Sequence, residues 1–158
     1  MEINVSNIII GIISIFICCV PFIISRYNRK KKEKKIFIPL QTLAQQINCT
    51  IHEHEFCGDF VIGMDKTKHF VFFVKNIKEN ISTKVVNLNS IQTCKVVKNT
   101  KKNNGNYLIV SDVLLCFVPK NKHDAEILFE LYDYNTNLQL SGELQFVEKW
   151  KDLIRKHL

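Results

Sequence analysis

The sequence predicts an α+β protein that is mainly antiparallel β, with one N-terminal transmembrane helix ahead of a curled sheet or barrel. Three observations predict this class. Residues Val5–Ser25 contain no charged residue. Aromatic and β-branched runs then alternate with segments rich in Asn and Lys. Finally, apolar residues recur every three or four positions near the C-terminus. We therefore expect about six or seven strands closed by a C-terminal helix.

The charge-free run is long enough to be a membrane anchor. Its 21 residues would span about 31 Å as a helix, against a hydrocarbon core of about 30 Å. A cleaved signal peptide is the competing interpretation, but it needs a basic start and small residues at its cleavage site. Here the only charge before Arg26 is Glu2, and Cys19-Val20-Pro21 offers no such site. We expect an uncleaved anchor over residues 1–25.

The basic charge is concentrated directly after this run. The whole chain has 22 Lys and Arg against 15 Asp and Glu, a net charge of +7. A net +6 of this lies in residues 26–35, whose only acid is Glu33, whereas Ile36–Leu158 carries 15 basic and 13 acidic residues, a net +2. The positive-inside rule predicts an inner-membrane protein with its N-terminus outside and its C-terminal domain cytoplasmic. The predicted membrane-surface residues are Arg26, Arg29, Lys30, Lys31, Lys32, Lys34 and Lys35. A nearly neutral domain gives no indication of nucleic-acid binding.

Residues 26–38 are expected to form a basic juxtamembrane linker, and residues 39–158 the cytoplasmic domain. Helical spacing of Leu40, Leu43, Ala44 and Ile47 predicts a short helix that starts at Pro39. An antiparallel meander should follow. Its expected strands are Ile51–Phe56, Phe60–Met64, His69–Lys75, Thr83–Leu88, Ile91–Lys98, Tyr107–Val118 and Glu126–Asp133. The closing helix has Leu144, Val147, Trp150, Ile154 and Leu158 on one face, and Trp150 is the expected plug of the sheet.

No motif in the sequence indicates catalysis. The sequence contains no G-x-S-x-G, P-loop, dinucleotide fingerprint or H-E-x-x-H. Cys49, Cys57, Cys94 and Cys116 have no zinc-site spacing and lie in apolar or β contexts, so we expect buried, unreactive thiols. We expect neither enzyme activity nor a cofactor.

Two groups of residues are weaker binding candidates. His52 and His54 would share one face of a strand, as an H-x-H metal pair requires, although such pairs are more often polar surface. Lys66 and Lys68 lie in one expected turn, and Lys101 and Lys102 in another. If the turns converge, these lysines are candidates for binding an anionic lipid headgroup; otherwise they are solvated loop charges.

Several segments resemble a known group of proteins. They are GDFVIGMDKTKHFVFFVK (58–75), VNLNSIQTCKVVK (86–98), LLCFVPKNK (114–122), ILFELYD (127–133) and LQLSGELQFVEKWKDLI (138–154). The chain resembles uncharacterised membrane-anchored proteins of Bacteroidota with a pleckstrin-homology-like (PH-like, GRAM-type) domain. The resemblance implies a small PH-like module behind a membrane anchor, and no activity that could be transferred.

Together these observations predict a membrane-anchored, non-catalytic binding or adaptor module. Its cytoplasmic domain is expected to act on a protein partner, through an exposed strand edge or a groove between strand and helix. Binding of anionic lipid headgroups is the alternative, and metal-binding or enzymatic roles rank below it.

Overall fold

The computed structural model describes the backbone of residues 5–77, 80–102, 105–137, 139–140 and 142–158, and side chains from residue 13 onward. The chain divides into two compact units, residues 1–35 and 36–158, and each is treated by itself. The division lies inside one helix, α1 (Val5–Gln46).

The part of α1 in the first unit exposes apolar side chains, among them Ile15, Phe16, Ile17, Phe22 and Ile23. Nevertheless, no helix within the described residues is both long enough and apolar enough to cross a membrane. Residues 1–4 of the expected anchor lie outside the described residues.

The helix does not stop where the sequence suggested. It continues through residues 26–38, expected as a linker, and through Pro39, expected as a helix start. Lys, Arg and Glu are good helix formers, and Arg29 Nε pairs with Glu33 Oε1 at 2.8 Å one turn later. Ile36 is already buried, one turn before Leu40. The apolar face that holds the helix on the domain therefore begins before Pro39.

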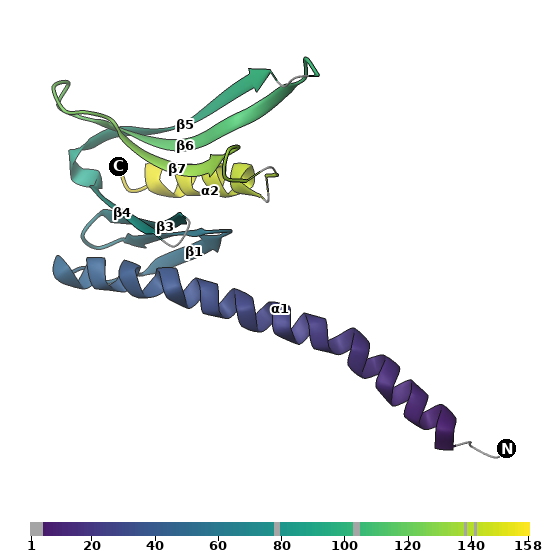
Figure 1. Ribbon diagram of the computed structural model, residues 1–158. Coiled ribbons are helices and arrows are strands. Elements are labelled where there is room, and N and C mark those ends of the chain that lie inside the picture. The colour runs from purple at the N-terminus through teal and green to yellow at the C-terminus, as the bar shows by residue number, and fades with distance from the viewer. Residues whose placement is uncertain (1–4, 78–79, 103–104, 138, 141) are drawn as a thin grey trace. The chain divides into compact units, whose positions relative to one another are not determined.

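The strands form two antiparallel sheets (Figure 1). The first has the order β1 (Glu53–Cys57), β2 (Phe60–Asp65), β3 (Phe70–Ile77), β4 (Asn80–Asn87). A short 3-10 helix, η1 (Leu88–Ser90), leads to the second sheet, in the order β5 (Ile91–Lys102), β6 (Leu108–Pro119), β7 (Ile127–Asp133). The C-terminal helix α2 (Glu143–Arg155) completes the α+β domain and lies between the two sheets in Figure 1.

The expected curled sheet or barrel is not a closed barrel, because the described strands form two separate sheets. Among the described residues, no backbone ladder joins the four-stranded sheet to the three-stranded one. The space between the sheets is filled instead by α2, whose Phe146 and Trp150 belong to the same core as Phe60 of β2 and Phe117 of β6. With a helix in that space, the sheets cannot approach closely enough to pair all round. Burial of Trp150 in this core confirms its expected packing role.

The two-residue periodicity of the first sheet separates two cores. On β2, Phe60, Ile62 and Met64 face the core shared with α2, whereas Val61 faces a second core. That second core holds Ile36, Leu40 and Ala44 of α1 against the other face of the sheet. Because both faces are covered, every residue of β2 is buried. Among the residues whose side chains are described, both cores consist only of residues from Ile36 onward, so they lie within residues 36–158.

One glycine permits the close approach of α1. A Cβ built on Gly63 of β2 would lie 3.0 Å from Leu40 Cδ2 and 3.3 Å from Ile51 Cδ1. A side chain at this position would require Leu40 and Ile51 to shift by a few tenths of an ångström.

Candidate functional site

A groove runs between β1 and the first turns of α2. It has a volume of about 340 Å³. Its lining residues are Glu55, Phe56, Cys57, Gly142, Gln145, Phe146 and Lys149. Since β1 lies at the edge of its sheet and pairs only with β2, one row of its backbone N–H and C=O groups faces away from the sheet.

Glu55 fixes the two walls of the groove to one another. Its Oε2 accepts hydrogen bonds from the indole Nε1 of Trp150 at 2.9 Å and from Lys149 Nζ at 2.8 Å. Trp150 is 1% exposed, so its ring is held by the core and its N–H group is aimed at β1. The carboxylate bond to Lys149 raises the pKa of that ammonium group.

Acidic groups surround the end of the groove near Cys57. Burial raises the pKa of the Cys57 thiol to about 11, and the carboxylates of Glu143, Asp59 and Glu55 contribute to the same shift. Burial also raises the pKa of Asp59, although Lys75 nearby opposes this. Lys75 is itself buried on β3 and pairs with Glu130 Oε1 of β7 at 3.0 Å. A thiol in these surroundings stays protonated at neutral pH and is a poor nucleophile.

The other thiols of the domain are similarly unreactive. Burial raises the pKa of Cys94 to about 12 and that of Cys116 to about 11. Cys116 Sγ also donates a hydrogen bond to Glu126 Oε2 at 3.0 Å. Burial raises the pKa of Cys49 as well. Their arrangement supports packing rather than covalent chemistry.

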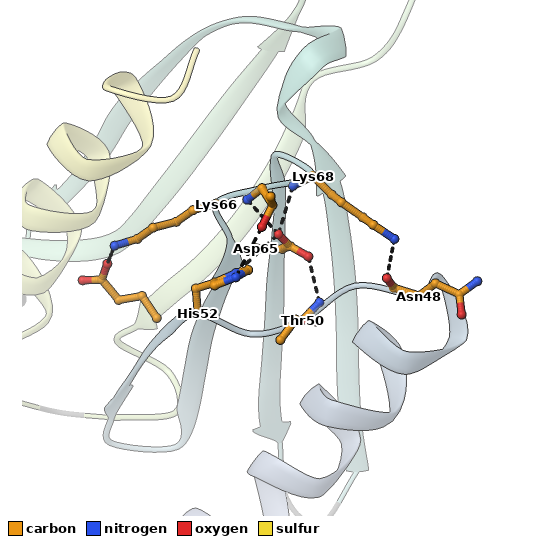
Figure 2. A network of polar contacts seen from close by, with 8 residues as sticks. Asn48, Thr50, His52, Asp65, Lys66 and Lys68 are labelled. Carbon is orange, nitrogen blue, oxygen red and sulfur yellow. Dashed lines mark hydrogen bonds and ion pairs between the residues drawn. The ribbon is translucent and has the colours of Figure 1, made fainter.

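Asp65 organises the polar network at the other end of β2 (Figure 2). Its carboxylate is 1% exposed and accepts backbone N–H groups from Thr50 at 2.7 Å, Thr67 at 2.8 Å and Lys68 at 2.9 Å. Burial alone would raise the pKa of Asp65, but these three N–H groups lower it to about 2. One carboxylate thus holds the chain that leaves α1 against the turn between β2 and β3.

The two candidate metal ligands lie in different surroundings. His52 precedes β1, and its Nδ1 lies 3.4 Å from Asp65 Oδ1 while its Nε2 lies 3.3 Å from Thr67 Oγ1. The ring of His54 instead packs 4.6 Å from that of Phe37, centroid to centroid. Within the described part of the chain, no three His, Cys, Asp or Glu side chains are placed to hold a metal ion.

The candidate lipid-binding lysines also have separate contacts. Lys66 Nζ pairs with Glu53 Oε2 at 2.6 Å, and Lys68 Nζ donates to the carbonyl of Asn48 (Figure 2). Lys101 Nζ lies 3.5 Å from Asn135 Oδ1 and 4.3 Å from the ring centroid of Tyr134. In the described contacts, Lys66 and Lys68 share no acceptor with Lys101 and Lys102. The seven basic residues of α1 predicted at the membrane surface are all exposed.

The sequence led us to expect a strand edge or a groove between strand and helix, but nothing in it indicated which residues line the groove. Its two walls come from residues 55–57 and 142–149, which lie almost ninety positions apart. Glu55 reads as an ordinary outward-facing residue of a strand, and only its contact with Trp150 gives it a role.

No protein-family model matches the chain, and no match was found among curated proteins or among solved structures.

Proposed function

We propose that this protein is a membrane-anchored, non-catalytic binding module. Its cytoplasmic domain would hold an extended segment of a protein partner in the groove between β1 and α2. The observation that carries the proposal is the coincidence of a sheet edge with a groove of about 340 Å³ beside it. An added strand can pair with such an edge through its backbone, while alternate side chains enter the groove.

The anchor in this proposal is the first part of α1, as a single-pass helix in the inner membrane with its N-terminus outside. It is supported by the charge-free sequence 5–25 and by the exposed apolar side chains between Ile13 and Ile24. The exposed basic residues from Arg26 to Lys35 would then lie among the lipid headgroups on the cytoplasmic side. Attachment to the membrane raises the local concentration of partners at that surface.

The PH-like assignment of the domain is part of the same proposal. The resemblance depends on an order of strands with a closing helix, and it is supported by the seven described strands followed by one helix. Two sheets with a helix between them also agree with a PH-like module, although they are not closed into a barrel.

Two photo-cross-linking variants of the full chain, expressed in its native membrane, test whether the groove binds a partner. The photoreactive residue p-benzoylphenylalanine is placed at Gln145, which lines the groove, or at Asp152, an exposed position on the same helix outside it. We expect one partner to cross-link from position 145 and not from position 152. Its cross-linked peptide should compete for binding as a free peptide.

Filling the groove gives the second arm of the test. Gln145→Trp should abolish the cross-link and the peptide binding, while Asp152→Trp should leave both intact. Thermal unfolding of both variants shows whether the fold is kept. Equal binding by the two folded variants would remove the groove as the site.

A further inference from the structure

The tip of the β5–β6 hairpin exposes two adjacent apolar side chains. Tyr107 is 76% exposed and Leu108 is 70% exposed, more than any other large apolar residue described in residues 36–158. Both lie where β6 begins, away from the groove residues. Single exposed apolar residues are common on protein surfaces, but two neighbours at the end of a hairpin form a protruding apolar point.

The chain around this point is basic. Residues 91–111 contain Lys95, Lys98, Lys101 and Lys102 and no acidic residue. Lys95 pairs with Glu126 and Lys98 with Glu148, so these two lysines are already neutralised within the domain. Lys101 contacts only the neutral Asn135 and Tyr134 among the described residues, and Lys102 has no ion pair or hydrogen bond with them.

The ladder places Lys102 on the same face as Leu108, and Lys101 on the opposite face beside Ile109. Lys102 is the register partner of Leu108, and Lys101 that of Ile109. Directly opposed residues of an antiparallel pair project from the same face of the sheet at about 5 Å between Cβ atoms. The ammonium group of Lys102, which has no ion pair with the described residues, therefore lies next to an exposed leucine.

We propose that this tip patch, defined as Lys101, Lys102, Tyr107 and Leu108, is a contact site for an anionic lipid bilayer. An amphipathic tyrosine suits the headgroup level of a bilayer, leucine suits the boundary with the acyl chains, and lysines suit the lipid phosphates. The patch is too small for a stable protein interface, which buries about 1,200 Å² or more. Contact with a bilayer does not require a surface of complementary shape.

This inference depends on the proposed anchor only for the nearness of a membrane, and it is independent of the groove. It also differs from the expected headgroup site, because Lys66 and Lys68 take no part. The domain's net charge of only +2 predicts weak binding by the isolated domain. A lysine near an anionic surface contributes about a fivefold gain in partitioning.

Vesicle co-sedimentation of residues 36–158, which contain both cores and lack the anchor, tests the patch. We expect binding to vesicles of phosphatidylglycerol and phosphatidylcholine at 3:7, and little binding to pure phosphatidylcholine. Lys101→Gln with Lys102→Gln should weaken binding by about 25-fold, since each lysine contributes about fivefold and the two factors multiply. Tyr107→Ser with Leu108→Ser should weaken it at least fivefold.

Matched control variants carry the same kinds of substitution elsewhere on the domain. Lys120→Gln with Lys122→Gln removes two exposed lysines, and Ile81→Ser with Leu128→Ser removes two partly exposed apolar side chains. Both controls should bind within twofold of the unaltered domain. Equal binding to neutral and anionic vesicles, or equal losses in test and control variants, would overturn the proposal.

A second measurement uses the full chain in lipid nanodiscs. Hydrogen exchange of residues 105–110 should be slower in nanodiscs with phosphatidylglycerol than in purely neutral ones. If the tip variants change self-association on gel filtration but leave vesicle binding unaltered, the patch is a contact between copies and the lipid proposal is wrong. Failure of the groove test affects neither result.

Discussion

The indole N–H of Trp150 on α2 donates a hydrogen bond to Glu55 Oε2 on β1, at 2.9 Å and across ninety-five positions of the chain. The ring belongs to the core, and the carboxylate belongs to an edge strand. The bond therefore sets the separation of the two walls of the groove. The bond also gives a partner to the indole nitrogen of Trp150, the one polar atom of this buried side chain.

Trp150→Phe removes this bond and keeps most of the ring. We expect a loss of about 1–2 kcal/mol in the free energy of unfolding, since a hydrogen bond to a charged group is lost. Trp150→Ala adds the cost of a large cavity, for a total of about 3–5 kcal/mol. Urea unfolding followed by circular dichroism measures both. A Trp150→Phe variant as stable as the unaltered protein would show that the bond carries no net stability.

Asp65→Asn tests the network at the end of β2. The amide keeps one acceptor oxygen but places an NH₂ group toward backbone N–H groups that need acceptors. We expect a destabilisation of about 2 kcal/mol at pH 7. Lys66→Gln, which breaks only a partly exposed ion pair with Glu53, is the matched control and should cost less than about 1 kcal/mol.

The same carboxylate predicts a dependence of stability on pH. Its pKa is about 2 in the folded protein, against an ordinary value of 3.8, so the unfolded chain binds the proton more readily. The stabilisation is complete above about pH 4 and is lost as the pH falls toward 2, by about 2 kcal/mol. Chemical unfolding at a series of pH values should show this slope, and Asp65→Asn should reduce it. An unchanged slope in the variant would assign it to other carboxylates.

The thiols of the domain should resist alkylation in the folded state. The raised pKa values of Cys49, Cys57, Cys94 and Cys116 leave little thiolate at pH 8. We expect mass spectrometry of residues 36–158 to show slow labelling by iodoacetamide at pH 8 and complete labelling in urea. Fast labelling of one native thiol would identify a reactive group that this arrangement does not predict.

Gly63→Ala should be destabilising although alanine is small. The new Cβ would lie 3.0 Å from Leu40 Cδ2 and 3.3 Å from Ile51, so these two side chains must shift by a few tenths of an ångström in a packed core. We expect a cost of about 1–3 kcal/mol. Leu40→Val, combined with Gly63→Ala, should recover part of it, because the shorter side chain makes room. Additive losses in the double variant would show that the two sites are not in steric conflict.

The helices and strands of the domain were largely predictable from the sequence. Whether the strands close into a barrel was not. Alternating apolar residues such as Phe60, Ile62 and Met64 predicted strands, and the spacing from Val147 to Trp150 to Ile154 predicted α2. Pro39 gave a wrong helix start, because the tertiary contacts of Ile36 outweigh a local preference. The strands form two sheets instead of a barrel because α2 occupies the space between them. Local sequence patterns do not predict where a helix packs.

The site was less predictable for the same reason. His52 and His54 were paired by spacing, yet one contacts Asp65 and the other packs against Phe37. Lys101 and Lys102 were expected in a turn, but both lie at the end of β5, because the strand continues further than its polar sequence indicated. The exposure of Tyr107 and Leu108 beside them depends on where the hairpin leaves the core, which only the folded structure shows.

The seam between the two sheets combines lysine contacts with the shared aromatic core, in which the ring centroids of Phe73 and Phe129 lie 4.9 Å apart. Lys75 reaches Glu130 at 3.0 Å, and Lys84 Nζ reaches the carbonyl of Leu128 at 2.5 Å. Such contacts resist a mechanical load far less than a continuous ladder of backbone hydrogen bonds. A pull on the C-terminus would therefore meet the side-chain contacts of α2 first, and then this seam. Under tension the domain would come apart between its sheets while each sheet kept its own strands.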